Sequence, residues 1–235
     1  MIQKIFSTSE FMIALRGQTP VTLEIQTSLL FPYSVTLPPG MCLRGVDSNK
    51  AILSFNNSDG IGLTADNEIS NLIIQTNPSQ RAIYALSDSS DLGTFKLSYL
   101  TVTGQIQILT RTGTKNTKLI ADHVDIVACD ARKYSEQPQK YGVNVYQGAF
   151  TVYNFNSDPE SVIRATLTNI SLGRKGAPVI GSGLYVSGFG DQGGRVEVDT
   201  LTTNEIHSNG MIPYGTPNMI TAGLFVVYGA HVKSI

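Results

Sequence analysis

The sequence predicts an all-β protein built as a β-solenoid, and two recurring patterns carry this prediction. In the first pattern, apolar residues alternate with small or polar residues, which indicates a short strand. In the second, an apolar residue stands at the first and the fourth of four positions. The first pattern occurs at Gly60–Leu63, Ala82–Ala85, Gln105–Ile108, Gly142–Val145, Gly183–Val186 and Gly223–Val226. The second follows in five of the intervals, at Ile69–Leu72, Leu97–Leu100, Ala121–Val124, Leu167–Ile170 and Val198–Leu201. Two strand signatures per repeat, with no helix between them, are typical of stacked coils.

The repeat lengthens along the chain, from 22 residues between Ile61 and Ile83 to 40 residues between Leu184 and Leu224. Aligned apolar residues of stacked coils form a continuous core. We expect one wall of that core to contain Ile61, Leu63, Ile83, Ile106, Ile108, Val143, Val145, Leu184, Val186 and Leu224. We expect a second wall of Leu72, Leu100, Val124, Ile170 and Leu201.

A short helix is predicted over residues 7–17. Ser7 and Glu10 have the spacing of a capping box, in which each side chain satisfies a free backbone donor of the first turn. Phe11 and Ala14 share one face, and Gly17 supplies a stop. An open first coil would expose strand edges and core to water, so we expect this helix to cover that end, before the first strand.

Short strands are predicted directly after the helix, over residues 21–25, 35–37, 41–43 and 52–55. Each alternates apolar and polar residues, so one face of each strand is expected to be buried. The turn Pro38-Pro39-Gly40 separates two of them. Proline fixes φ in such a turn and glycine takes the unusual dihedral angles.

The stretch from Ser9 to Gly45, with Leu37-Pro38-Pro39-Gly40-Met41-Cys42-Leu43-Arg44-Gly45 at its end, resembles the opening of pectin-lyase-like proteins. The later repeats are similar to that superfamily in period and turns. The resemblance implies a right-handed parallel β-helix, with residues 1–235 as one domain and residues 1–20 as its N-terminal cap. Lyases of the superfamily hold calcium with several Asp and use Arg or Lys as the base, and its hydrolases use clustered Asp pairs. This sequence has no Asp-Asp, Asn-Thr-Asp, Gly-His-Gly or Arg-Ile-Lys motif, so no catalytic residue is carried over.

The long later repeats contain polar segments that we expect at the turns, where insertions into a solenoid emerge. Binding residues are concentrated on such loops. We predict that the loops at 130–141, 173–182, 187–195 and 207–222 gather on one side and form the binding surface. The last coil, after Gly223, has no predicted cap. An uncovered edge would recruit other strands, so either the chain is a fragment of a longer solenoid, which we favour, or a further copy covers this end as a homo-oligomer.

Composition excludes several partners. The net charge is −1 and charged residues make up 15% of the chain, with the basic residues scattered, so nucleic acid is not an expected partner. No apolar run is long enough for a membrane span. The N-terminus lacks a signal peptide, which indicates a cytoplasmic protein, or a secreted one if a signal has been removed. Cys42 and Cys129 are about four coils apart, and we expect two buried free thiols.

The candidate binding residues fall into three groups. His123 and Asp125 are two apart on one predicted strand, and Glu205 and His207 repeat that arrangement; an imidazole beside a carboxylate is a general base or a metal ligand, or only a solvated surface pair. The third group is the basic and aromatic segment Arg132, Lys133 and Tyr134. No spacing indicates a metal site, and the glycine-rich residues 188–194 lack the lysine and the following helix of a phosphate loop, so no cofactor is expected.

The function predicted on this basis is a carbohydrate-associated scaffold that binds a polysaccharide on its looped side, without a recognisable catalytic centre. Tryptophan is absent, so sugar stacking would rely on tyrosine. Two alternatives stay open. One is a structural solenoid, such as part of an adhesin, a phage appendage or an assembly. The other is a polysaccharide lyase or glycoside hydrolase with a divergent site. Whether the chain is an enzyme is not decided by its sequence.

Overall fold

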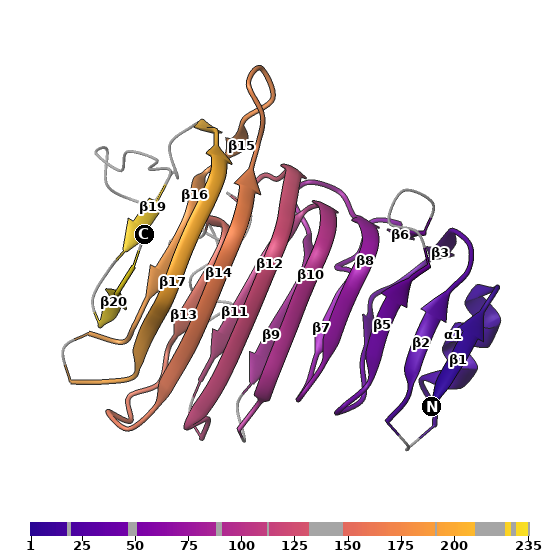
Figure 1. Cartoon of the computed structure of the whole chain (residues 1–235), viewed down its shortest axis with the longest axis horizontal. Helices are drawn as coiled ribbons and strands as arrows, with labels where there is room; N and C mark the ends of the chain where they lie inside the picture. Colours follow the sequence, from indigo (N-terminus) through magenta and orange to yellow (C-terminus); the bar gives the residue numbers. More distant parts are fainter. Residues whose placement is uncertain are drawn as a thin grey trace.

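The computed structural model describes residues 1–17, 20–46, 51–87, 91–111, 113–131, 148–190, 192–209, 224–226 and 229–234. Within these ranges the chain forms an all-β structure of parallel sheets with one short helix. Figure 1 shows the strands lying side by side in a long stack, with the N-terminus and the helix at one end and the last strands at the other.

The larger sheet has eleven strands and is parallel throughout. Its main path runs through β1 (Ile2–Ile5), β2 (Thr22–Ile25), β5 (Cys42–Gly45), β8 (Glu68–Gln75), β10 (Gly93–Thr103), β12 (Asn116–Ala128), β14 (Val162–Leu172), β17 (Arg195–Ile206) and β20 (Ala230–Val232). Two short strands beside this path are β3 (Leu29–Phe31) and β6 (Ile52–Phe55).

A second parallel sheet has seven strands. In spatial order they are β19 (Leu224–Val226), β16 (Ser182–Ser187), β13 (Gly148–Asn154), β11 (Gln105–Thr110), β9 (Arg81–Ser87), β7 (Ile61–Leu63) and β4 (Val35–Thr36). From β7 to β14 the chain alternates strictly between the two sheets, and inward side chains of both belong to one hydrophobic cluster. The core therefore lies between the sheets along the whole stack.

The predicted core positions are confirmed wherever their side chains are described. All five residues of the second wall are at most 2% exposed, and Leu63, at 5%, is the most exposed of the first-wall residues. Residues at the equivalent position of successive coils lie beside one another in the larger sheet: the ladder pairs Leu43 with Ile69, Ile69 with Leu97, and Leu97 with Ala121. The side chains of Val143, Val145 and Leu224 lie outside the described residues.

Two of the predicted repeat alignments are wrong. The strand beside β11 is β13, in which Phe150 and Val152 pair with Ile106 and Ile108, so the repeat is not the one assigned to Gly142–Val145. The alternation in Phe150–Tyr153 is as regular as that in the earlier segment, so the pattern alone does not distinguish them. In β17, Leu201 pairs with Leu167 and not with Ile170, because the ladder contains register shifts.

The helix lies at the N-terminal end of the stack (Figure 1), but β1 comes before it and was not predicted. The helix α1 spans Thr8–Ala14 and is shorter than the predicted 7–17. Its N-cap is Ser7, whose hydroxyl accepts from the Glu10 amide at 3.2 Å, while the Glu10 carboxylate accepts from the Phe6 amide at 2.7 Å. Phe11 is fully buried and packs edge-on against Phe31, with ring centroids 5.0 Å apart.

The turn between β13 and β14 is held by a buried asparagine. Asn154 is 0% exposed, and its side-chain amide donates to the carbonyl oxygens of Ser161 and Arg195 at 3.1 and 2.9 Å. Its side-chain oxygen accepts from the Thr110 hydroxyl at 2.8 Å. The side chain therefore links β11, β13 and β17, which belong to both sheets.

Candidate functional site

Four strands of the larger sheet bend at a single residue in the left-handed backbone conformation. These residues are Asn71 in β8, Tyr99 in β10, His123 in β12 and Asn169 in β14, with φ between 52° and 54°. All four occupy the third position of the second sequence pattern. The ladder pairs the residues on either side of them, so the four lie beside one another on successive strands; we call them the corner column.

The corner column presents a stacked aromatic pair. The rings of Tyr99 and His123 have centroids 4.7 Å apart and an interplanar angle of 16°. This separation matches the ~4.8 Å spacing of neighbouring strands, so the stacking follows directly from the ladder register. Tyr99 is 54% exposed. Polar atoms and a flat ring are thus presented together at the surface.

Asp122 holds the corner column in place. Its carboxylate accepts from the Thr168 hydroxyl at 2.6 Å and the Asn169 side-chain amide at 2.9 Å, both from β14, and lies 2.9 Å from Nδ1 of His123. The hydrogen bonds from Thr168 and then Asn169 are the main reasons why the pKa of Asp122 falls to about 2. All three partners of this carboxylate are side chains.

A pocket of about 240 Å³ opens beside the corner column. Asp125 lines it, and one oxygen of its carboxylate pairs with Nη2 of Arg174 at 2.9 Å. The other oxygen, Oδ1, is buried, and no hydrogen bond to it is found within the described residues. We call this the corner pocket; it is lined by Tyr99, Leu100, Thr101, His123, Val124, Asp125, Asn169, Ser171 and Asn204.

The second predicted pair lies in the same row of the sheet. Asp125 pairs with Ser171 along the ladder, and Ser171 pairs with Glu205, so the two acidic residues are two strands apart, roughly 10 Å by strand spacing. Nε2 of His207 lies 3.1 Å from a carboxylate oxygen of Glu205. The structure therefore brings both acid-and-histidine pairs to one side of the larger sheet. The two pairs differ in their contacts, however: His123 contacts Asp122 rather than Asp125, whereas His207 contacts Glu205.

Some of the predicted loops meet and one does not. Residues 179–180 form β15 (Val179–Ile180), which pairs with β18 (Ser208–Asn209), and Asp130 bridges to Ile180. The described residues at the start of the loops after β12 and β17 therefore lie beside the loop after β14. The segment around Phe189 lies at a different turn, because Gly194 donates to the Asn156 carbonyl at 2.6 Å and Phe189 packs on Phe155. The prediction that all four loops gather is wrong for 187–195.

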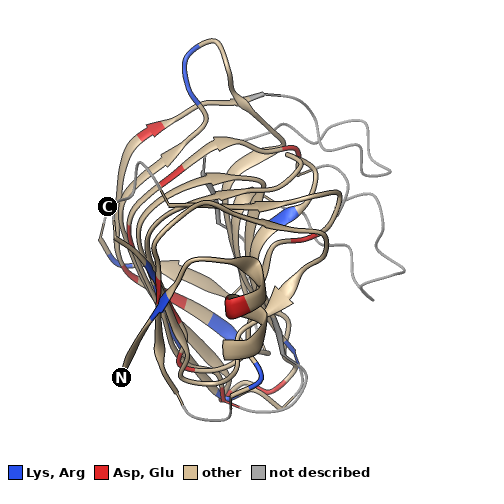
Figure 2. Ribbon diagram, turned by 90° about the vertical axis from the view of Figure 1, so that its right-hand side faces the viewer, with Lys and Arg blue, Asp and Glu red and all other residues tan. Residues whose placement is uncertain are grey.

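The remaining predicted residues, Arg132, Lys133 and Tyr134, lie outside the described part of the chain. Figure 2 looks along the stack and shows residues of both charge signs spread around the molecule. No helix in the described residues has the length and apolar character to span a membrane. Within the same residues, no three His, Cys, Asp or Glu side chains converge as metal ligands.

Sequence reasoning missed Tyr99, Asn169, Arg174 and Asn204. The signal for the first two was present, since Tyr99 and Asn169 stand at the same pattern position as His123. Arg174 reaches Asp125 from a loop, and its contact depends on how that loop folds back. A periodic pattern does not record such contacts.

The corner pocket combines an aromatic surface, two side-chain amides, two aliphatic hydroxyls and a carboxylate. These groups donate and accept hydrogen bonds and provide a flat apolar surface at the same time. Comparisons with protein-family models, with curated proteins and with solved structures found no match to this chain.

Proposed function

We propose that this chain is a right-handed parallel β-helix that binds a polysaccharide at the corner pocket and the loops beside it. The β-helix is supported by the strict alternation of the chain between two parallel sheets from β7 to β14. Right-handedness is supported by the general rule that about 98% of connections between parallel strands of one sheet are right-handed.

The observation that carries the binding proposal is the exposed Tyr99–His123 stack above the corner pocket. Sugars present hydroxyl groups around the ring and apolar C–H faces, so they are recognised by aromatic rings together with amides and carboxylates. Asn169 and Asn204 offer both donors and acceptors, and Asp125 offers an acceptor. Asp122 supports this arrangement by fixing Asn169 and the imidazole of His123.

The proposal assigns binding and no reaction. The hydrogen bonds to Asp122 keep it ionised at neutral pH, and Asp125 is engaged by Arg174. Both carboxylates therefore serve as fixed acceptors. Asp125 and Glu205 lie in one row across the sheet, and such a row suits an extended ligand that crosses several strands.

The test is calorimetry with a panel of neutral and acidic polysaccharides, on the wild type, Tyr99→Ala and Tyr33→Ala. The two tyrosines are equally exposed, at 54%, but Tyr33 lies near the N-terminal end, so it is a matched control. We expect Tyr99→Ala to weaken binding about tenfold, the size of one lost stacking contact, and Tyr33→Ala to bind as the wild type does. Equal affinity of the wild type and Tyr99→Ala would remove the corner pocket from the proposal.

The loop prediction needs its own variant. The double substitution Arg132→Ala, Lys133→Ala removes two charges from the segment that follows Ala131. If this loop also contacts the ligand, the double variant weakens binding of acidic polysaccharides more than that of neutral ones. Unchanged affinity for both classes would exclude the segment.

A structural role is the second candidate, and one observation favours it. Of the large hydrophobic side chains that are exposed in the described residues, most belong to the first 46 residues: Met1, Ile2, Phe6, Ile13, Leu30, Tyr33 and Val46. These residues belong to the first coils, and a contiguous exposed apolar patch marks contact with another protein. If no polysaccharide binds, and light scattering shows a stable assembly that Ile13→Ser weakens, the structural role replaces the binding role.

A further inference from the structure

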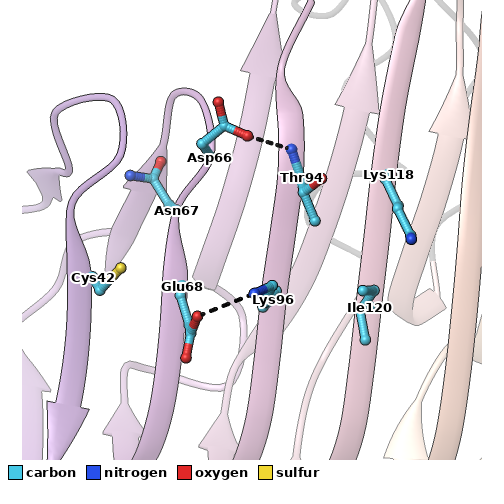
Figure 3. A pocket seen from close by; sticks show the side chains of 8 residues that line it. All are labelled: Cys42, Asp66, Asn67, Glu68, Thr94, Lys96, Lys118 and Ile120. Carbon is cyan, nitrogen blue, oxygen red and sulfur yellow. Dashed lines mark hydrogen bonds and ion pairs between the residues drawn. The ribbon is translucent and has the colours of Figure 1, made fainter. Parts of the chain in front are cut away.

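A second hollow lies on the outer face of the larger sheet and shares no residue with the corner pocket. It has a volume of about 420 Å³ and extends from β5 to β12. Figure 3 shows its lining, with Asp66 and Glu68 on one side, Lys96 and Thr94 in the middle and Lys118 on the other side. We call it the lysine groove.

Charge is distributed unevenly across the lysine groove. Its acidic groups, Asp66 and Glu68, precede or begin β8, whereas its ammonium groups lie on β10 and β12. Nζ of Lys96 lies 3.7 Å from Glu68, which is an ion pair without a short hydrogen bond. The Asp66 carboxylate accepts from the Thr94 amide at 2.8 Å. Both acids therefore retain acceptor oxygens, since each carboxylate accepts several hydrogen bonds.

Lys118 differs from most other basic side chains of this face. Five of these have ion-pair partners on the same face: Arg44 with Glu24, Lys96 with Glu68, Arg164 and Arg195 with Glu197, and Lys233 with Asp199. Within the described residues, Lys118 forms no ion pair. The Lys118 charge contributes to lowering the pKa of Asp199, but it is the last of the named effects, after Lys233 and Arg164.

The ladder also places Lys118 directly opposite a like charge. Its neighbours in register are Thr94 on β10 and Arg164 on β14. Like charges directly opposite each other destabilise a sheet pair. Lys96, Lys118 and Arg164 thus put three cations on three successive strands, and a bound anion would offset their repulsion.

We propose that the lysine groove binds an oxyanion, a sulfate or a carboxylate, that is attached to a hydroxyl-rich polymer. The oxyanion lies against the Lys118 ammonium, on the side that faces Thr94 and Lys96. Hydroxyl groups of the same unit donate to the free oxygens of Asp66 and Glu68, because ionised carboxylates only accept. Ile120 supplies the apolar part of the floor.

The experiment compares three probes with the same backbone: dextran sulfate, carboxymethyl-dextran and unmodified dextran. Binding to the whole chain is measured by calorimetry at low and high salt. The variants are Lys118→Gln, Lys118→Arg and, as a control, Lys4→Gln, which removes the same charge from an exposed position on β1, outside the groove and outside the loops beside the corner pocket. Circular dichroism establishes that each variant is folded.

We expect an anionic dextran to bind and unmodified dextran not to bind. Lys118→Gln should weaken that binding about five- to tenfold at low salt, the effect of one exposed charge-assisted contact, and less at high salt. Lys118→Arg should retain affinity and Lys4→Gln should match the wild type. Comparing the two anionic probes identifies sulfate or carboxylate as the recognised group.

Two results would overturn the inference. One is equal loss in Lys118→Gln and Lys4→Gln, which would mean that only the overall charge matters. The other is the absence of binding by both anionic probes. Neither result decides the proposal for the corner pocket, because that test uses Tyr99 and a separate set of residues.

Discussion

Replacing Asn71 by valine should destabilise the protein even though valine is a favoured strand residue. Asn71 lies within β8, but its φ is 53°, in the left-handed region. That region costs an ordinary L-residue about 1–2 kcal/mol, and a β-branched side chain fits it least well. Within the described residues, no hydrogen bond of the Asn71 side chain is found, so the backbone conformation dominates the effect. The advantage of valine in strands is at most about 1 kcal/mol.

We therefore expect Asn71→Val to lower the free energy of unfolding by about 1–2 kcal/mol. The assay is urea denaturation followed by circular dichroism. Ser70→Val is the matched control, because Ser70 is the preceding residue of the same strand, is similarly half-buried and has an ordinary φ; it should stay within about 0.5 kcal/mol of the wild type. Asn71→Gly, which tolerates positive φ, should lie closer to the wild type than Asn71→Val. If Asn71→Val is as stable as Ser70→Val, the corner column is not a conformational constraint.

Three further groups of substitutions or reagents test the core, the polar turn and the titrating side chains. Ile106→Ala should cost about 2–5 kcal/mol in urea denaturation through the cavity it leaves, and Asn154→Ala a similar amount because its buried partners lose their hydrogen bonds. The pKa of Asp122 is lowered to about 2, so its contribution to stability is complete above its ordinary value of 3.8 and is lost as the pH falls through 2. The stability difference between the wild type and Asp122→Asn should therefore be constant near neutral pH and shrink below pH 4; a difference that grows on acidification would contradict this sign. Burial raises the pKa of both cysteine thiols, and Cys129 is buried whereas Cys42 is partly exposed, so a thiol reagent should label Cys42 slowly in the native state and Cys129 only after unfolding.

The sheets could be predicted because their side-chain period is short and repeated. Ile69, Leu97 and Ala121 stand at the same place in their patterns and follow one another in the ladder. The prediction of strand register failed where the apolar pattern of the sequence does not determine which residues pair in the sheet. Two alternating segments compete for the place beside β11, and bulges in β17 shift Leu201 away from its predicted partner. The prediction of two buried thiols holds for Cys129 only, because Cys42 points to the outer face of β5.

The site was harder to predict than the fold. His123 and Asp125 do line one pocket, but the left-handed backbone at His123 turns its ring toward Asp122. A rule of strict alternation cannot anticipate this, because it assumes that every residue of the strand is extended. The contact between Arg174 and Asp125 joins residues of different coils through a loop. Such contacts depend on three-dimensional loop geometry and leave no periodic trace.

The corner column also determines where this chain tolerates added length. One residue makes the bend, while Ser98 with Asp122 on one side and Leu100 with Val124 on the other are fixed in register. An extra residue there would reverse every following side chain of the strand, from core to solvent. An insertion in the turn at Gly176, where nothing lies within 4 Å of an added Cβ, affects the short bridge between Arg174 and Ala177 and leaves the ladders of the two large sheets in register. Foreign peptides or affinity tags can therefore be displayed at that turn, whereas the bend at residues 71, 99, 123 and 169 must keep its length.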